Sequence, residues 1–286
     1  MAYPPPPTAP AGMTVPHDSA TVVLAVFSTI AAVLVVAAVV TWRRSGSPLM
    51  LAILAGGLVT VALEPFADVL GLVWFPPHDQ VHAFTSLGVP IPLFVVIGYL
   101  CFFGLVTWSL LRLLETGPTR RQFRRIAALG LGAALLLEFP LLPTGVYTYY
   151  GPQPLKVLDY PLIWMTINSG ACLVAALVIY RFRSFFAGGR AFAAVALLPC
   201  VDGAVMLATG WPAFTVMHTT APQWAVNLSG LVTLGLGVGL FGLVAEVCCT
   251  DGRFHVPARA AGPAWVARWM AGSRQPVPAR PYEPVG

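Results

Sequence analysis

The chain has 286 residues, of which 57% are hydrophobic and only 9% are charged. Soluble globular domains carry about 25% charged residues, so this composition, with a mean hydropathy of +0.79, excludes an ordinary soluble domain. The net charge of +5 does not indicate a nucleic-acid binder, because the basic residues lie at the ends of apolar stretches rather than in one patch. An integral protein of the cell membrane is expected.

Apolar stretches follow one another along the chain, each long enough to span a bilayer. A transmembrane helix needs about 20 apolar residues to cross about 30 Å of hydrocarbon. Such stretches cover approximately residues 19–42, 48–74, 90–114, 123–143, 158–182, 190–210 and 224–249. The sequence therefore predicts an all-α, polytopic transmembrane helix bundle of about seven spans, with residues 19–250 in contact with the lipid bilayer.

The two tails differ from this domain in composition. Residues 1–18 are rich in proline, and residues 251–286 carry proline and arginine, so both are expected to be mostly disordered. The first span is not interpreted as a cleaved signal peptide, because the proline-rich tail stands where a basic region would be required. In the second tail, Trp265, Arg268 and Trp269 share one helical face, which predicts a short interfacial helix.

The basic residues indicate a direction for the bundle. Of the 16 Lys and Arg side chains, two follow the first span, five lie between the third and fourth, three lie between the fifth and sixth, and five follow the seventh. Only Lys156 lies on the opposite side. Because cytoplasmic loops are enriched in Lys and Arg, we expect the N-terminus outside and the C-terminus inside. Glu115 and the arginines are interpreted as ordinary charges at the cytoplasmic edge.

Polar side chains gather in the outer half of the predicted bundle. An ionisable group at membrane depth is costly unless it is paired or faces water, so each is a candidate functional residue. The candidates for substrate binding are Tyr147, Tyr149, Tyr150, Trp164, Asn168, Asp202 and His218. Two other roles stay open, because Tyr and Trp also form interfacial belts, and Asn and Asp also make hydrogen bonds between helices.

The strongest local pattern is Glu64-Pro65-Phe66-Ala67-Asp68. The i, i+4 spacing places both carboxyl groups on one helix face, and Pro65 should kink or restart the helix. Two carboxylates so close together in a poorly hydrated place cannot both ionise cheaply, so one is expected to keep its proton and act as an acid beside an anion. The alternative is that both cap a broken helix or pair with a neighbour.

Glu138 precedes a second helix-breaking proline, Pro140. It is interpreted as a third catalytic carboxyl group in the same chamber, or as a hydrogen-bond partner of backbone freed by the proline. His78 and His82 could share a helical face and bind a metal ion together with the acids, but histidines in a loop near water are more often solvated, so no metal is expected there.

Several segments together resemble the AveC-like spirocyclase family of actinobacterial-type membrane proteins. They are residues 63–76 (LEPFADVLGLVWFP), 83–92 (AFTSLGVPIP), 138–140 (EFP), 145–156 (GVYTYYGPQPLK) and 210–212 (GWP), within a likeness that covers about residues 20–250. The resemblance implies spiroketal formation in polyketide biosynthesis, in which a ketone with two hydroxyls closes into two rings that share one carbon, with loss of water. Some relatives are associated with dehydration or with stereochemical control.

This chemistry suits the carboxyl groups described above. A neutral acid would protonate the departing hydroxyl, and the neighbouring carboxylate of the Glu64 and Asp68 pair would stabilise the oxocarbenium ion, with Glu138 and Tyr150 assisting. Aromatic rings would fold a hydrophobic substrate and favour the cation. This chemistry needs neither a metal nor an organic cofactor. The predicted chamber lies toward the outer leaflet, whereas polyketides are assembled in the cytoplasm.

Two other functions remain open. A hydratase, dehydratase or cyclase acting on an isoprenoid or another lipid would use the same acids. A transporter or receptor that binds a lipid or small molecule would not be an enzyme. A retinal protein is excluded, because the seventh span has no lysine to form a Schiff base.

Overall fold

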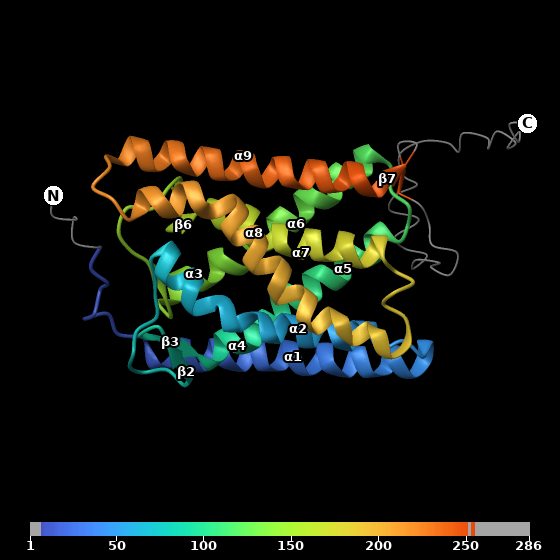
Figure 1. Ribbon diagram of the computed structural model, residues 1–286. Helices are drawn as coiled ribbons and strands as arrows, with labels where there is room; N and C mark the ends of the chain where they lie inside the picture. The colour runs from blue at the N-terminus through green and yellow to red at the C-terminus, as the bar shows by residue number, and fades with distance from the viewer. Residues whose placement is uncertain (1–6, 251–252, 255–286) are drawn as a thin grey trace, which may run out of the picture.

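The computed structural model describes residues 7–250 and 253–254 (Figure 1). Within them, seven helical segments are long and apolar enough to cross a membrane, so the predicted all-α seven-span bundle is confirmed. They are His17–Ser45, Leu49–Gly71, Leu93–Leu114, Arg120–Thr144, Ile163–Arg181, Gly188–Met217 and Gln223–Cys248. The predicted interfacial helix around Trp265 and the ends of both tails (residues 1–6 and most of 251–286) lie outside the described residues.

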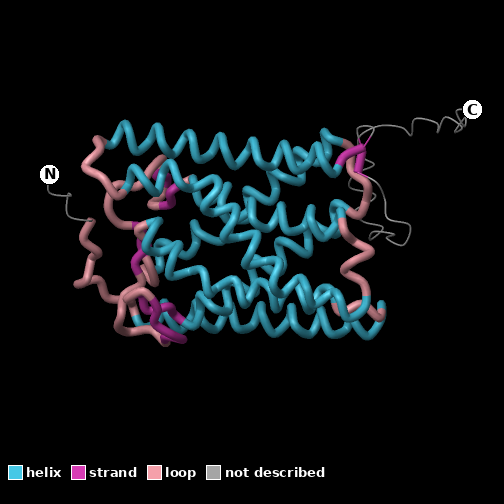
Figure 2. The backbone as a smooth tube through the Cα atoms, viewed as in Figure 1, coloured by secondary structure: helices cyan, strands magenta, loops and turns pink. Residues whose placement is uncertain are grey.

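Several spans are built from more than one element, and short strands lie mainly at one end of the bundle (Figure 2). The helical elements are α1 (His17–Ser45), α2 (Leu49–Thr60), η1 (Val61–Leu63), α3 (Glu64–Gly71), α4 (Leu93–Tyr99), η2 (Leu100–Gly104), α5 (Leu105–Leu114), α6 (Arg120–Leu141), η3 (Leu142–Thr144), α7 (Ile163–Arg181), η4 (Gly188–Phe192), α8 (Ala193–Met217) and α9 (Gln223–Cys248). The paired strands are β1 (Val73–Trp74) with β4 (Thr148–Tyr149), β2 (His82–Ser86) with β3 (Val89–Pro92), β5 (Lys156–Val157) with β6 (Tyr160–Pro161), and β7 (Cys249–Thr250) with β8 (Arg253–Phe254).

The second span is interrupted where Pro65 predicts a break. A 3₁₀ turn, η1, ends α2, and α3 restarts at Glu64 with Pro65 in its first turn. Proline fits there because the first turn of a helix has no intrahelical acceptor for its backbone N–H groups. The restart places Glu64 and Asp68 one turn apart on α3.

Other boundaries differ from the sequence-based prediction. The third span starts at Leu93 rather than near residue 90, because β3 pairs with β2 up to Pro92. The sixth span continues past residue 210 to Met217, with Pro212 accommodated inside α8. Residues 7–16 of the first tail form an irregular segment, in which Val15 is buried, and α1 begins at His17.

Helices α2 and α7 form the centre of the bundle. Helix α2 packs against α8 and η2, and α7 packs against α5, α6, α8 and α9. Glycine allows the closest crossing: a Cβ at Gly57 would lie 2.7 Å from the backbone nitrogen of Gly104, and one at Gly104 would lie 3.0 Å from the Cα of Leu54. Small residues of this kind let membrane helices approach backbone to backbone.

The end of the bundle that carries the arginines contains a buried ion cluster. Glu115 is fully buried between Arg112 and Arg183, and the Nε of Arg183 lies 2.6 Å from Glu115 Oε1. The interpretation of Glu115 as an ordinary edge charge was therefore wrong. By contrast, Glu246 is exposed and forms an ion pair with Arg120 at 2.7 Å.

The cysteines are all free, and four of the five are buried, as expected for small hydrophobic side chains. Cys200 is the exception, because it is exposed on α8.

Candidate functional site

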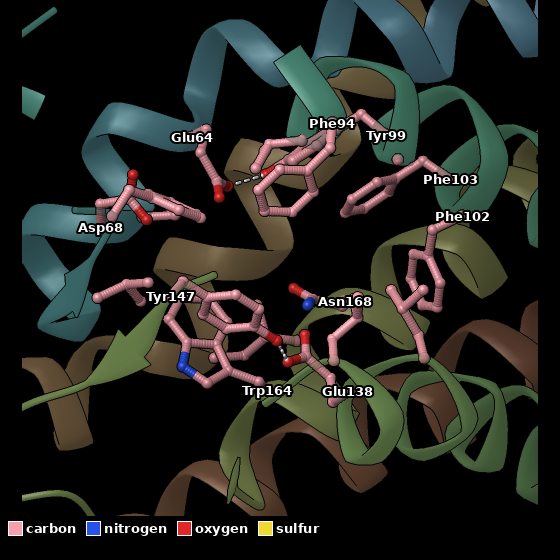
Figure 3. Close-up of a pocket in the computed structure, with 18 of the residues that line it drawn as sticks. Glu64, Asp68, Phe94, Tyr99, Phe102, Phe103, Glu138, Tyr147, Trp164 and Asn168 are labelled. Atoms are coloured by element: carbon pink, nitrogen blue, oxygen red, sulfur yellow. Dashed lines mark hydrogen bonds between the residues drawn. The ribbon is translucent and has the colours of Figure 1, made fainter. Parts of the chain in front are cut away.

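A cavity of about 110 Å³ lies in the half of the bundle opposite the arginine-rich end. Its walls come from α1, α3, α4, η2, α6, α7 and α8 and from the segments around β1 and β4. Most of the lining is apolar or aromatic, and the polar side chains are Glu64, Asp68, Tyr99, Glu138, Tyr147, Tyr149, Trp164, Asn168 and Asp202 (Figure 3). The three carboxyl groups expected in one chamber, Glu64, Asp68 and Glu138, thus border a common cavity.

One wall carries the two carboxyl groups of α3. The hydroxyl of Tyr99, at the end of α4, donates a hydrogen bond to Glu64 Oε2. Asp68 is 1% exposed, and neither of its carboxyl oxygens has a hydrogen-bond partner among the described residues. A buried carboxylate without a partner is costly, so Asp68 is the group in this wall that most requires either a proton or a bound polar ligand.

The facing wall carries Glu138, near the C-terminal end of α6 (Figure 3). The hydroxyl of Tyr147 donates a hydrogen bond to Glu138 Oε2, and the hydroxyl of Tyr149 lies 3.5 Å from the same atom. Burial raises the pKa of both tyrosines well above its usual value, and the adjacent Glu138 raises it further. Both side chains therefore remain phenols and act as donors at physiological pH.

The tyrosines reach Glu138 because of the pairing between β1 and β4. Val73 is opposite Tyr149 in this antiparallel pair, which joins the end of α3 to the segment after α6. Leu72 has a positive φ of 55° and turns the chain out of α3 into β1. Gln153 holds this turn, since its Nε2 donates to the carbonyls of Gly71 at 3.0 Å and Tyr150 at 2.8 Å.

Two further polar side chains lie closer to the middle of their helices. Asn168 projects from α7, and Asp202, which is 5% exposed, projects from α8. Glu64 is close enough to Asp68, Glu138 and Asp202 to interact electrostatically with each of them. No Lys, Arg or His side chain lines the cavity, so its four carboxyl groups lack a neutralising cation in the described structure.

Aromatic rings form a continuous layer that borders the cavity. It contains Phe27, Phe94, Phe75, Tyr147, Tyr149, Trp164 and Phe214, with neighbouring ring centroids 5.6–6.5 Å apart. This aromatic layer runs from α1 to α8, and all of its rings except that of Phe214 line the cavity.

Eight of the ten predicted site residues line the cavity, and Tyr150 and His218 do not. Tyr150 is held by its backbone N–H, which donates to the carbonyl of Leu72 at 2.9 Å, and His218 Nε2 lies 3.1 Å from the carbonyl oxygen of Leu70. Sequence reasoning missed Tyr99. A tyrosine well inside an apolar span, away from the interface, was the available signal, because its hydroxyl requires a buried partner.

Comparisons with known proteins give no family for this chain. Comparison with protein-family models, with curated proteins and with solved structures finds no match. In the described part of the chain, no group of three or more His, Cys, Asp or Glu side chains is arranged to hold a metal ion. His82 Nε2 instead lies 3.3 Å from the carbonyl oxygen of Pro76. The function is therefore inferred from the cavity itself.

Proposed function

We propose that this protein is a membrane-embedded acid/base catalyst that cyclises or dehydrates an oxygenated hydrophobic substrate through a cationic intermediate. The observation that carries the proposal is the pair of carboxyl groups on α3 in a cavity without basic side chains. Glu64 accepts a hydrogen bond from Tyr99, whereas the buried Asp68 has no partner among the described residues. The two groups thus have different surroundings although they lie one helical turn apart.

Different surroundings suit the two groups to different roles. A donated hydrogen bond favours a carboxylate, so Glu64 is the group assigned to stabilise positive charge and to accept a proton. A buried carboxyl group without a partner is better accommodated as the neutral acid, so Asp68 is assigned to donate a proton to a departing hydroxyl. Loss of water then leaves an oxocarbenium or carbenium ion in the substrate.

The rest of the cavity suits a cationic intermediate. Rings of Phe94, Phe103 and Trp164 line it, and the faces of aromatic rings attract cations. Glu138 faces the α3 pair from the opposite wall, where it can accept the proton of an attacking hydroxyl, and Tyr147 holds it in place. The apolar walls also keep bulk water away from the cation.

We further propose that the reaction is spiroketal formation, or a related dehydration, in a polyketide-like substrate. Support comes from the resemblance of the segments around Glu64, Glu138 and Tyr147 to AveC-like spirocyclases, in addition to the acid/base geometry. In that reaction a hemiketal hydroxyl leaves as water from the Asp68 side. A second substrate hydroxyl then attacks the oxocarbenium carbon and gives up its proton to a carboxylate.

Metabolite profiling with matched variants tests this function. A strain lacking the gene should accumulate an open-chain or hydrated precursor, and the wild-type gene should restore the cyclised or dehydrated product. Asp68→Asn and Glu64→Gln should each reduce product formation by a factor of about 10² to 10⁴, the usual contribution of a general acid or base. The control is Asp79→Asn, which removes an exposed carboxyl group in an outer loop.

The possible outcomes separate the candidate functions. Full product formation by both Asp68→Asn and Glu64→Gln, at normal folded yield, would remove the catalytic assignment. A substrate that becomes redistributed across the membrane but is chemically unchanged would identify a transporter instead. Detection of a dehydrated or cyclised isoprenoid would support the acid/base mechanism and would identify the substrate as an isoprenoid instead of a polyketide.

A further inference from the structure

We propose that the cavity opens sideways into the outer leaflet through a window between α4 and α6. In this interpretation the ligand is a long apolar molecule dissolved in the bilayer, which inserts only its oxygenated segment between the carboxyl groups. The window follows from packing alone. The identity of the ligand as a substrate rests on the proposed function.

The route from the outer aqueous side is closed. Rings of the aromatic layer defined above line the cavity, and the strand pair β1–β4 with the Gln153 side chain lies at the end of the bundle away from the arginines. The irregular segment before α1 adds a further cover, because a Cβ at Gly151 would lie 2.9 Å from Pro7. A water-soluble ligand would have to displace several tightly packed elements.

The route from the inner side is closed by backbone packing. Gly57 and Gly104 bring α2 and η2 into direct contact. Phe102 and Phe103 line the inner end of the cavity, and Tyr99 stacks on Phe103 with ring centroids 4.8 Å apart. The next layer inward is a cluster of buried apolar side chains that includes Leu110, Leu111 and Leu114 of α5.

The lateral side of the cavity is not closed in the same way. Helices α4 and α6 both line the cavity, but they are not among the closely packed helix pairs of the described chain. At the inner edge of this window, Leu110 lies 3.6 Å from the position of a Cβ at Gly130. At the outer edge, Pro16 lies 3.6 Å from the position of a Cβ at Gly145.

Between these edges the window is framed by apolar side chains. Val95 lies on the α4 side, and Leu137 and Leu141, which are both half-buried, lie on the α6 side. Leu136, next to Leu137, is 81% exposed and marks the face of α6 that meets lipid. An aliphatic chain can cross such a frame without losing its apolar surroundings, whereas a charged group cannot.

Cavity size explains why only part of the ligand would enter. The free space of about 110 Å³ is somewhat smaller than a cavity of about 150 Å³ that holds one benzene molecule in another protein. A window to lipid lets the remaining chain stay in the bilayer, so a large substrate does not need a large cavity.

Carbodiimides test the window independently of any turnover. Dicyclohexylcarbodiimide partitions into lipid, and it adds across a carboxylic acid to give a stable N-acylurea without another reactant. The water-soluble ethyl-dimethylaminopropyl-carbodiimide reacts through the same group. In phosphatidylcholine vesicles, the apolar reagent should modify residues 64–68 at least about tenfold faster than the water-soluble one, each rate measured by mass spectrometry relative to the exposed Asp79.

Adjacent residues on α6 supply the matched variants. Leu137→Trp, which narrows the window, should slow apolar labelling of residues 64–68 by about fivefold, whereas Leu136→Trp, which points a ring of the same size into lipid, should not. Leu141→Trp provides a second narrowing variant on the same wall. Gel filtration in detergent verifies that each variant is folded.

Each outcome decides the proposal. Equal labelling of residues 64–68 by both reagents, no labelling by the apolar reagent, or unchanged labelling in both Leu137→Trp and Leu141→Trp would overturn the window. If labelling follows the expected pattern while no product is found in metabolite profiles, the window stands and the proposed enzymatic function fails. If turnover is found but the water-soluble reagent labels residues 64–68 as fast as the apolar reagent or faster, the proposed enzymatic function stands and the window fails.

Discussion

Two buried carboxyl groups at opposite ends of the bundle have opposite surroundings. At the arginine-rich end, Glu115 is fully buried and forms ion pairs with Arg112 and Arg183. In the other half, Asp68 is 1% exposed and has no hydrogen-bond partner among the described residues. Burial alone therefore does not show whether a carboxyl group has a partner that compensates its charge.

The difference between the two groups lies in their partners. Glu115 joins the end of α5 to the segment after α7, and the adjacent Arg112 and Arg183 compensate its charge. Asp68 borders a cavity and adds an uncompensated polar group to it, which native proteins tolerate mainly where it serves a function. If this comparison is right, removing the two groups should have different effects on stability.

The largest expected effect on stability comes from Glu115→Gln. This change leaves two arginines without their counter-charge, at a cost of about 2–3 kcal/mol in the free energy of unfolding, reduced from the fully buried case because both arginine side chains are 28% exposed. Asp68→Asn should cost less than about 1 kcal/mol, since no partner is lost.

Thermal unfolding in detergent measures both changes. Glu246→Gln is the control, because the Glu246 side chain is 55% exposed and its ion pair with Arg120 should contribute less than about 1 kcal/mol. An Asp68→Asn variant as unstable as Glu115→Gln would show that the comparison is mistaken and that Asp68 is structural.

A smaller loss of stability is expected at the helix crossing that supports the cavity. In Gly57→Ala, the new methyl group would meet the backbone nitrogen of Gly104 at 2.7 Å and the carbonyl oxygen of Tyr99 at 3.0 Å, so α2 and η2 must separate. We expect a cost of about 1–2 kcal/mol together with reduced turnover, because Tyr99 would shift relative to Glu64.

Gly132→Ala is the matched control for this crossing. A Cβ at Gly132 has no heavy atom within 4 Å, so the unfolding free energy should change by less than about 0.5 kcal/mol. Unfolding and product formation should be measured on the same preparations. Equal stability of Gly57→Ala and Gly132→Ala would contradict the close crossing.

Much of this organisation could be predicted from the sequence, because hydropathy and helical periodicity are local properties. The seven spans followed from apolar length, and the restart at Pro65 followed from the missing backbone donor of proline. The common face of Glu64 and Asp68 followed from their spacing.

The partners of these groups could not be predicted, because they come from distant parts of the chain. Arg183 reaches Glu115 across 68 positions, and Tyr99 reaches Glu64 across 35. Which of Tyr147, Tyr149 and Tyr150 face the cavity could be predicted in part. In an extended backbone, the side chains of residues 147 and 149 point to one side and that of residue 150 points to the other. The pairing of β4 with β1 then turns the 147/149 side toward Glu138.

The smallest expected effect is that of Tyr99→Phe, for which Tyr150→Phe is the control. Tyr99→Phe removes one hydrogen bond to Glu64, a loss of about 1 kcal/mol, so kcat should fall roughly fivefold with little change in KM. Tyr150→Phe should leave both constants unchanged, because Tyr150 does not line the cavity. Steady-state kinetics with the precursor identified by metabolite profiling would measure both variants. A larger loss in Tyr150→Phe than in Tyr99→Phe would mean that the substrate contacts the loop that carries Tyr150 and that the reaction takes place outside the cavity.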